Sequence, residues 1–256
     1  MLGSPIAHSR SPALHRAAYA ALGLPWSYDA VELRPDGLAG WLDGLGPEWA
    51  GLSLTMPLKQ TVLPLVDELS PLAAATGAAN TVLLQGGRRL GDNTDVAGLL
   101  EALREAGCTA AGRSVVLGGG ATAASALAAL ARLGDDRPWV LVRDPARTAP
   151  LAAAAARLGV RPRIGRLEDL AARLDEDPDV VVSTLPAGAA DALPAARSAS
   201  PVLLDVVYAP WPTALAQTWA GPVVGGAAML LHQAAAQVQL MTGRPAPVEA
   251  MRAALG

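Results

Sequence analysis

A short apolar strand, a glycine turn and an alanine-rich helix follow one another in the middle of the chain. This unit constrains the fold more than any other feature. The strand is predicted at Ser114–Leu117, the turn is Gly118–Gly120 and the helix covers Ala121–Leu133. The turn has the pattern G-x-G-x-x-A, in which small residues let the backbone approach a pyrophosphate and the first N–H groups of the helix favour its negative charge. Ordinary strand-to-helix turns also contain glycines, so the motif alone leaves both interpretations open.

The alternation of strands and helices continues downstream of this unit. We predict strands at Trp139–Val142, Val180–Thr184 and Val202–Val207, and helices at Pro145–Leu158 and Leu167–Leu174. Apolar strands that alternate with helices are typical of a parallel sheet, in the order of a Rossmann fold. The apolar helices predicted at 227–242 and 248–254 follow the last strand, and we expect them to pack back against the first part of the chain.

The first part of the chain also alternates helices with strands. We predict a helix over Pro12–Leu22, with Ser11 as its N-cap, and strands at 27–33, 50–54 and 80–84, the last followed by a hairpin-like Gly86-Gly87. The expected fold class is therefore α/β: an N-terminal αβ domain with a mainly parallel sheet, residues 1–98 completed by 229–256, and a Rossmann dinucleotide-binding domain, residues 99–228.

Composition excludes several classes of protein. Apolar residues make up 52% of the chain and charged residues 17%, so burial can offset the entropy lost on folding. No run approaches the ~18 apolar residues of a membrane span, and the first ten residues lack the layout of a signal peptide, so we expect a cytoplasmic protein. Cys108 is the only cysteine and the three histidines are poorly spaced, which disfavours a metal site. A net charge of −3 offers no basic surface for nucleic acid.

Lys59 is the only lysine among 20 basic residues. An ammonium can give up its proton in a reachable pH range, whereas a guanidinium cannot, so a lone lysine in an arginine-rich chain invites a chemical role. The alternative is that Lys59 is a remnant of a compositional bias toward arginine. Composition alone does not separate the two interpretations.

Polar residues collect at strand-to-helix junctions of the first part of the chain. They occur in the segments 8–12 (HSRSP), 55–59 (TMPLK), 80–81 (NT) and 91–95 (GDNTD). Each segment has a local explanation as a cap or a turn. Together, however, their hydroxyl, amide, amino and carboxylate groups would suit a polyhydroxylated small-molecule substrate.

At these segments the chain resembles the shikimate dehydrogenase family, essentially from end to end. The matching motifs are 3–15 (GSPIAHSRSPALH), 53–59 (SLTMPLK), 77–81 (GAANT), 92–98 (DNTDVAG), 183–186 (STLP), 205–210 (DVVYAP) and 226–233 (GAAMLLHQ). The resemblance implies reversible, NADPH-dependent reduction of 3-dehydroshikimate to shikimate in the biosynthesis of chorismate and the aromatic amino acids.

The resemblance also assigns roles to residues. It implies that Lys59 and Asp95 are catalytic. It implies that the substrate is bound by Ser9, Ser11, Thr55, Asn80, Tyr208 and Gln233. It implies that the cofactor is bound by Gly118, Gly119, Gly120, Ala121, Thr122, Arg143, Arg147, Thr184, Val206, Gly226 and Met229.

Four departures from the family pattern are visible. The first strand is shortened at Met1-Leu2, or the true start lies upstream; Ser53 stands where Asn is usual; Ala121 replaces a glycine; and 142–144 (VRD) replaces Asn-Arg-Thr. Arginines after the second Rossmann strand favour the 2′-phosphate of NADP, whereas Asp144 facing the ribose would favour NAD, which we expect less.

Two other functions stay open: an NAD-dependent quinate/shikimate dehydrogenase, and a non-catalytic paralogue that acts as a binding module. The presence of both Lys59 and Asp95 argues against the second. We expect a monomer or a homodimer.

Overall fold

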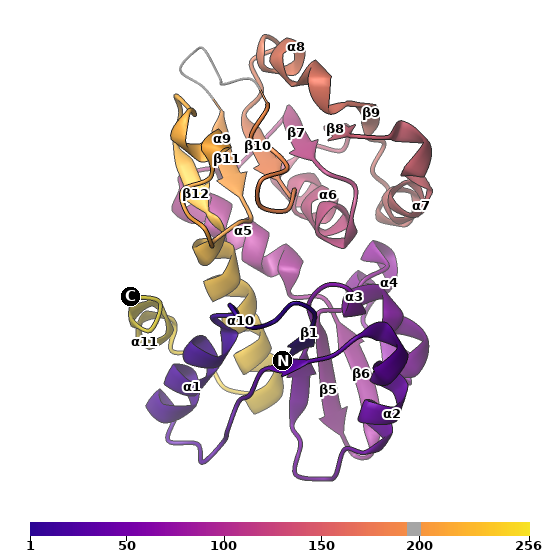
Figure 1. The fold of residues 1–256 in the computed structure, drawn as a ribbon, viewed down its shortest axis with the longest axis vertical. Coiled ribbons are helices and arrows are strands. Elements are labelled where there is room, and N and C mark those ends of the chain that lie inside the picture. Colours follow the sequence, from indigo (N-terminus) through magenta and orange to yellow (C-terminus); the bar gives the residue numbers. More distant parts are fainter. Residues whose placement is uncertain (194–200) are drawn as a thin grey trace. The chain divides into compact units, whose positions relative to one another are not determined.

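The computed structural model describes residues 1–193 and 201–256, which form two compact units (Figure 1). Unit 1 comprises Met1–Gly98 and Leu230–Gly256, and unit 2 comprises Leu99–Met229. The boundaries between the units fall inside two helices, α5 (Asp95–Glu105) and α10 (Gly226–Thr242).

Unit 2 contains a six-stranded, fully parallel sheet. Its strands are β7 (Ser114–Leu117), β8 (Trp139–Val142), β9 (Arg163–Arg166), β10 (Val180–Ser183), β11 (Val202–Asp205) and β12 (Val223–Gly225). They lie in the order β12-β11-β10-β7-β8-β9. Read from β9, this is the order 3-2-1-4-5-6 of dinucleotide-binding sheets, with its switch point between β7 and β10. The predicted Rossmann fold is confirmed.

The central strands of this sheet are buried on both faces. Every residue of β7 and β10 is buried, as expected for apolar runs in a parallel sheet. The helical elements of this unit are α6 (Ala121–Leu133), η3 (Pro145–Arg147), α7 (Ala149–Leu158), η4 (Leu167–Asp169), α8 (Leu170–Leu174) and α9 (Ala214–Gln217). The core between sheet and helices includes Leu117, Leu141, Leu170, Leu203 and Leu215.

Unit 1 contains two smaller sheets. The four-stranded sheet has the order β3 (Gly51–Ser53), β5 (Thr81–Gln85), β6 (Arg88–Asp92), β4 (Glu68–Leu69), and the two-stranded sheet pairs β1 (Leu2–Gly3) with β2 (Val31–Glu32). Within unit 1, β1 pairs with β2 and β4 pairs with β6 in parallel, whereas β5 pairs antiparallel with both β3 and β6. Both glycines of the turn between β5 and β6 have positive φ, which confirms the predicted hairpin.

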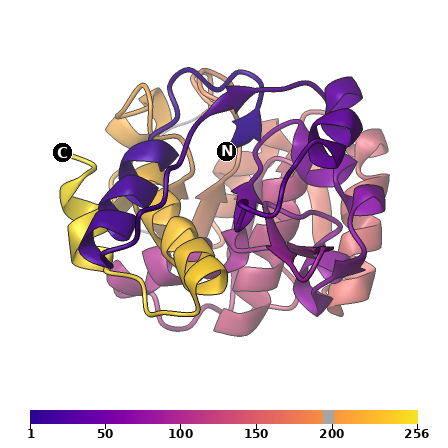
Figure 2. The ribbon, with the colours of Figure 1, turned by 90° about the horizontal axis from the view of Figure 1, so that it is seen from below.

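Helices from both ends of the chain pack together in unit 1. They are α1 (Ser11–Ala21), α10 and α11 (Val248–Ala253), and Figures 1 and 2 show α1, in indigo, beside the yellow helices. Their shared core includes Leu14, Leu231, Val238 and Met251. The C-terminal helices therefore return to the first part of the chain, as predicted. The other helical elements of this unit are η1 (Pro35–Gly37), α2 (Leu38–Asp43), α3 (Leu58–Thr61), η2 (Leu63–Leu65) and α4 (Pro71–Thr76).

The start of α1 corrects one prediction. The N-cap is Arg10, whose side chain makes no capping hydrogen bond, and Ser11 is the first helical residue. The hydroxyl of Ser9 accepts the backbone N–H of Ser11 at 3.3 Å. The prediction that Ser11 is the N-cap is therefore wrong, because the helix begins one residue earlier than its proline suggests.

Among the residues that the structure describes, no helix combines the length and the apolar character needed to cross a membrane.

His15 is completely buried on α1. Its ring stacks on Tyr28 with 4.0 Å between centroids, and its two nitrogens lie 3.3 Å from the hydroxyl of Tyr19 and 3.1 Å from Oε1 of Gln237. Burial disfavours the charged ring and lowers the pKa of His15 to about 3. The histidine is therefore neutral in the folded protein at neutral pH.

This buried histidine makes stability depend on pH. The unfolded chain binds a proton at His15 as the pH falls through about 6.5, whereas the folded protein resists protonation down to about pH 3. Its contribution to stability is thus complete above pH 6.5 and is lost between pH 6.5 and 3, by up to ~1.4 kcal/mol per pH unit. In urea unfolding at pH 7.5, 5.5 and 4.5, His15→Phe should make the free energy of unfolding depend less steeply on pH than it does in the wild type. The exposed control His8→Asn should keep the wild-type slope, and an unchanged slope in His15→Phe would refute the assignment.

Candidate active site

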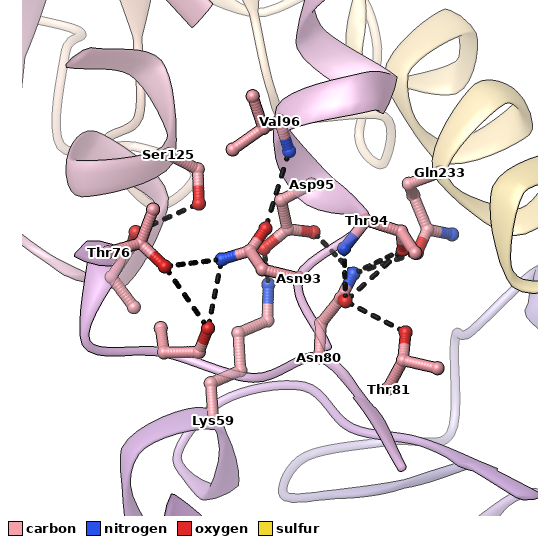
Figure 3. Close-up of polar contacts among 12 residues, drawn as sticks. Lys59, Thr76, Asn80, Thr81, Asn93, Thr94, Asp95, Val96, Ser125 and Gln233 are labelled. Atoms are coloured by element: carbon pink, nitrogen blue, oxygen red, sulfur yellow. Dashed lines mark hydrogen bonds and ion pairs between the residues drawn. The ribbon is translucent and has the colours of Figure 1, made fainter. Parts of the chain in front are cut away.

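Lys59 and Asp95 form an ion pair in unit 1 (Figure 3). The Lys59 Nζ atom lies 2.6 Å from Asp95 Oδ2, and the two side chains are 14% and 4% exposed. A charge pair this far removed from water needs further hydrogen bonds to offset the desolvation of its members. The surroundings of the pair therefore decide whether it is stable.

The chain delivers the two charged side chains from different local structures. Lys59 lies on α3, a single turn of helix that follows β3 after the segment 54–57, and the Leu58 N–H donates to the carbonyl of Thr55 at 2.8 Å. Asp95 is the first residue of α5, where the free N–H groups of a helix start favour a negative charge. The ion pair thus joins the helical turn α3 to the start of α5.

Asn80, 1% exposed, holds the other oxygen of Asp95. Its Nδ2 lies 2.9 Å from Asp95 Oδ1 and from Thr94 Oγ1, and 3.2 Å from Gln233 Oε1. Its Oδ1 accepts the Thr94 N–H at 2.8 Å and the Thr81 hydroxyl at 2.9 Å, as Figure 3 shows. Each carboxylate oxygen of Asp95 therefore has its own donor, which sets the orientation of the carboxylate.

Gln233 reaches this cluster from α10. It is 7% exposed, its Nε2 donates to the carbonyl of Leu230 at 2.9 Å, and its Oε1 faces Asn80. Lys59, Asn80, Asp95 and Gln233 are four predicted site residues that the structure brings together.

The two serines of the N-terminal motif have partners within unit 1. Ser9 Oγ also lies 2.6 Å from the sulfur of Met1, in addition to its contact with the backbone of Ser11. Ser11 is almost completely buried, with 3% of its surface exposed. Thr55 is partly exposed and packs on Gly3, where a Cβ atom would lie 2.3 Å from Thr55 Cγ2. Gly3 is therefore needed to keep the motif and Thr55 in contact.

Unit 2 carries the predicted nucleotide turn at its switch point. Gly118 has φ of +107°, and a Cβ there would lie 2.5 Å from the Thr184 hydroxyl, which donates to the Leu117 carbonyl at 2.8 Å. Only glycine fits this close approach. A Cβ on Gly120 would meet nothing within 4 Å, and no side chain caps α6. The N–H groups of Ala121 and Thr122 open this helix, so the turn suits an approaching anion.

Arg143, Asp144 and Arg147 are exposed after β8. The Asp144 carboxylate accepts the Ala146 N–H at 3.0 Å and caps η3, so it is occupied in its own turn. Neither arginine forms an ion pair with an acidic side chain among the described residues. A Cβ on Gly119 would lie 3.1 Å from Val142, which places the arginine segment next to the glycine turn.

The remaining predicted residues of unit 2 lie near the ends of β11 and β12. Gly226 packs so tightly that a Cβ would lie 2.1 Å from the carbonyl oxygen of Val206, and its N–H donates to Val207 at 3.1 Å. Met229 is 7% exposed and Tyr208 is half-buried. In the part of the chain that is described, no group of three or more His, Cys, Asp or Glu side chains could hold a metal ion.

Sequence reasoning assigned no role to several polar residues around these sites. Gln237 and Thr81 contact Asn80, and Asp205, 1% exposed, accepts hydrogen bonds from Thr213 at 2.7 Å and from the Val207 N–H at 3.2 Å. Burial raises the pKa of the Asp205 carboxyl. One signal for Gln237 was present in the sequence: it lies four residues after Gln233, on the same face of a helix.

Two family models match parts of this chain. Residues 1–82 match the shikimate dehydrogenase substrate binding domain, and residues 226–255 match the shikimate 5′-dehydrogenase C-terminal domain. A curated relative from Moorella thermoacetica, named shikimate dehydrogenase (NADP(+)), is 37% identical over 98% of this chain and 90% of its own length.

Solved structures are similar over nearly the whole chain. The shikimate dehydrogenase of Mycobacterium tuberculosis has a TM-score of 0.91 and 44% identity, with 99% of this chain and 97% of that chain covered. The enzyme from Thermus thermophilus, solved in complex with NADP(H) and shikimate, has a TM-score of 0.86 and 34% identity, with 99% and 96% covered.

Proposed function

The chain belongs to the shikimate dehydrogenase family, and we propose that its Lys59–Asp95 pair carries the proton chemistry of that family's reaction. The protein is an NADP-dependent oxidoreductase that acts on a CH–OH group and interconverts shikimate and 3-dehydroshikimate, a step of the shikimate pathway to the aromatic amino acids. The observation that carries our assignment within the chain is the 2.6 Å contact between two nearly buried, opposite charges.

Lys59 is suited to the reacting oxygen of the substrate. NADPH, when bound, supplies a hydride to the carbonyl carbon. Negative charge then grows on the carbonyl oxygen, and the Lys59 ammonium stabilises that charge and gives its proton to the oxygen. In the direction of shikimate oxidation, the Lys59 amine receives the hydroxyl proton. Asp95 holds Nζ in place and bonds a neighbouring hydroxyl of the substrate.

The substrate-binding residues are assigned by their chemistry. Ser9 and Ser11 offer hydroxyl groups to the carboxylate of the substrate, and Thr55, Asn80, Gln233 and Tyr208 offer hydrogen bonds to the ring hydroxyls. The contacts that Asn80 and Gln233 make with each other support this, because buried polar groups aimed at one site discriminate against ligands that lack a partner for them.

The NADP-binding residues form three groups. The pyrophosphate lies against Gly118, Gly119, Gly120, Ala121 and Thr122 at the start of α6. Arg143 and Arg147 bind the 2′-phosphate, and the use of Asp144 Oδ1 as a cap supports this assignment because it directs that carboxylate toward its own turn. The nicotinamide side is lined by Thr184, Val206, Gly226 and Met229.

The domain roles follow from these assignments. Residues 1–98 with 229–256 bind substrate and carry the catalytic pair, and residues 99–228 bind NADP. A cytoplasmic location, and a monomer or homodimer as the assembly, stay predictions.

A rate matrix of NADP and NAD against shikimate and quinate, followed by absorbance of the reduced nicotinamide, tests the function. We expect the highest kcat/KM with NADP and shikimate. Preference for NAD with quinate would establish a quinate dehydrogenase instead, and no turnover with any pair would establish a binding module.

Lys59→Ala should lower kcat by on the order of 10²-fold or more, because general acid–base catalysis contributes that much. KM for shikimate should change far less. Gln60→Ala, an exposed neighbour on α3, is the matched control and should turn over like the wild type. Steady-state kinetics check this, with melting temperatures to confirm folding. Turnover close to wild type in a folded Lys59→Ala variant would remove Lys59 from the mechanism.

Arg143→Ala should raise KM for NADP much more than KM for NAD, since NAD has no 2′-phosphate. The loss of a charged hydrogen bond is worth roughly 1.5–3 kcal/mol, or tenfold and more in affinity. Arg137→Ala serves as control, because Arg137 is exposed and precedes β8, at the end opposite Arg143. Equal losses for both cofactors would show that Arg143 does not distinguish the phosphate.

A further inference from the structure

We infer that Gln237 is a positioning residue for the catalytic pair, which it orients through Thr81 and Asn80. The inference rests on the proposed function of Lys59 and Asp95. Gln237 lies on α10 one helical turn after Gln233, is 1% exposed, and contacts neither charged residue itself.

The side-chain amide of Gln237 uses its full hydrogen-bonding capacity. Its Nε2 donates to the carbonyl of Asn80 at 3.1 Å and to Thr81 Oγ1 at 3.0 Å. Its Oε1 accepts the Ser53 hydroxyl at 2.8 Å and faces His15 Nε2 at 3.1 Å. A primary amide has two N–H donors and two acceptor lone pairs, so none is left over. The side chain is thus held from four sides.

One set of proton positions satisfies all of these contacts on the His15 side. The Tyr28 hydroxyl donates to Ser53 at 2.7 Å, and Ser53 donates onward to Gln237. Burial lowers the pKa of His15 to about 3, so its ring is neutral, and the ring carries its proton on Nε2, facing Gln237 Oε1, while Nδ1 accepts from Tyr19. Rotating the Gln237 amide by 180° would place its oxygen against the Asn80 carbonyl oxygen, which can only accept a hydrogen bond, and this excludes the reversed orientation.

The proton positions continue from Gln237 to the catalytic pair. Because Gln237 donates to the Thr81 oxygen, the Thr81 proton points at Asn80 Oδ1, along the hydrogen bond that Figure 3 marks between these two residues. With its oxygen occupied by Thr81 and by the Thr94 N–H, the Asn80 amide turns its NH2 group toward Asp95 Oδ1. Asp95 in turn presents Oδ2 to Lys59. Each donor therefore determines the orientation of the next group.

The other arm of the network reaches α1 through His15, whose Nε2 lies 3.1 Å from Gln237 Oε1. Tyr28, which donates to Ser53, stacks on the ring of the same histidine. Gln237 thus links α1, which begins within the N-terminal motif, to the residues to which proton transfer is assigned. Hydrogen bonds in a chain polarise and strengthen one another, so a change at Gln237 should be felt at both ends.

Two variants of Gln237 test the inference. Gln237→Met has similar length but makes none of the four hydrogen bonds, and Gln237→Glu keeps the acceptor oxygen while losing the donor aimed at Thr81. Both should lower kcat about tenfold or more, since a misplacement of ~1 Å can cost on the order of 10²-fold. KM for NADP should stay unchanged. Gln239→Met, at an exposed position of the same helix, is the matched control and should retain wild-type kinetics.

A double-mutant cycle separates positioning from a purely structural role. Thr81→Val keeps the shape of Thr81 but breaks the path from the Gln237 amide through the Thr81 hydroxyl to Asn80 Oδ1, and by itself it should lower kcat. In the Thr81→Val background, Gln237→Met should lower kcat by less than a further twofold, because both substitutions break the same path to Asn80. Additive losses, or normal kcat with a lowered melting temperature, would reduce Gln237 to a core residue and overturn the inference.

If Gln237→Met does not fold, Thr81→Val by itself still tests the inference. A folded Thr81→Val variant with wild-type kcat would overturn it. The wild type and Lys59→Ala are measured in parallel. If Lys59→Ala keeps its activity, the proposed function of Lys59 fails. If Lys59→Ala loses activity while the Gln237 and Thr81 variants stay fully active, only the role of Gln237 is refuted.

Discussion

The carboxylate of Asp95 is the group on which the organisation of unit 1 depends. It is almost completely removed from water, so each of its oxygens requires a donor, and Lys59 and Asn80 provide one each. The ion pair and its hydrogen-bonded neighbours therefore bring together α3, the residue before β5, the start of α5 and the middle of α10. A polar cluster in a dry environment is favourable only when every member has its partners, and here the partners come from four elements.

The nucleotide turn in unit 2 depends on a different constraint, the close approach of backbone atoms. Gly118 and Gly226 each occupy positions where a Cβ would meet an oxygen atom at 2.5 Å or less, in Thr184 and Val206 respectively. Such contacts at the carboxyl ends of parallel strands hold the segment after β7 against that after β10, at the switch point, and the segment after β11 against that after β12. Unit 1 thus orients side chains through hydrogen bonds, whereas unit 2 orients backbone through the absence of side chains.

Apolar patterning predicted the buried elements well and the exposed ones poorly. The bounds expected for β7, α6 and β8 agree with the structure, because strands buried on both faces and a helix between glycines leave clear signals. The edge strands β9 and β12 were not predicted. The sequence of β9, Arg-Ile-Gly-Arg, has little apolar content. It forms a strand at the sheet edge because it pairs with its one neighbour, β8. The N-cap of α1 was predicted one residue too late, because residue type alone does not determine capping geometry.

The amino-acid sequence by itself determined the α/β class, the Rossmann order of elements, the family and the identity of the charged pair, because these depend on periodicity, on glycine at a turn and on short motifs within one segment. Only the tertiary structure decided which atoms pair. The contacts of Asn80 with Gln233 and Gln237, and of His15 with Gln237, join residues more than 150 positions apart. No local pattern records such a pairing, since a buried amide is oriented by whichever donors and acceptors the folded chain brings around it.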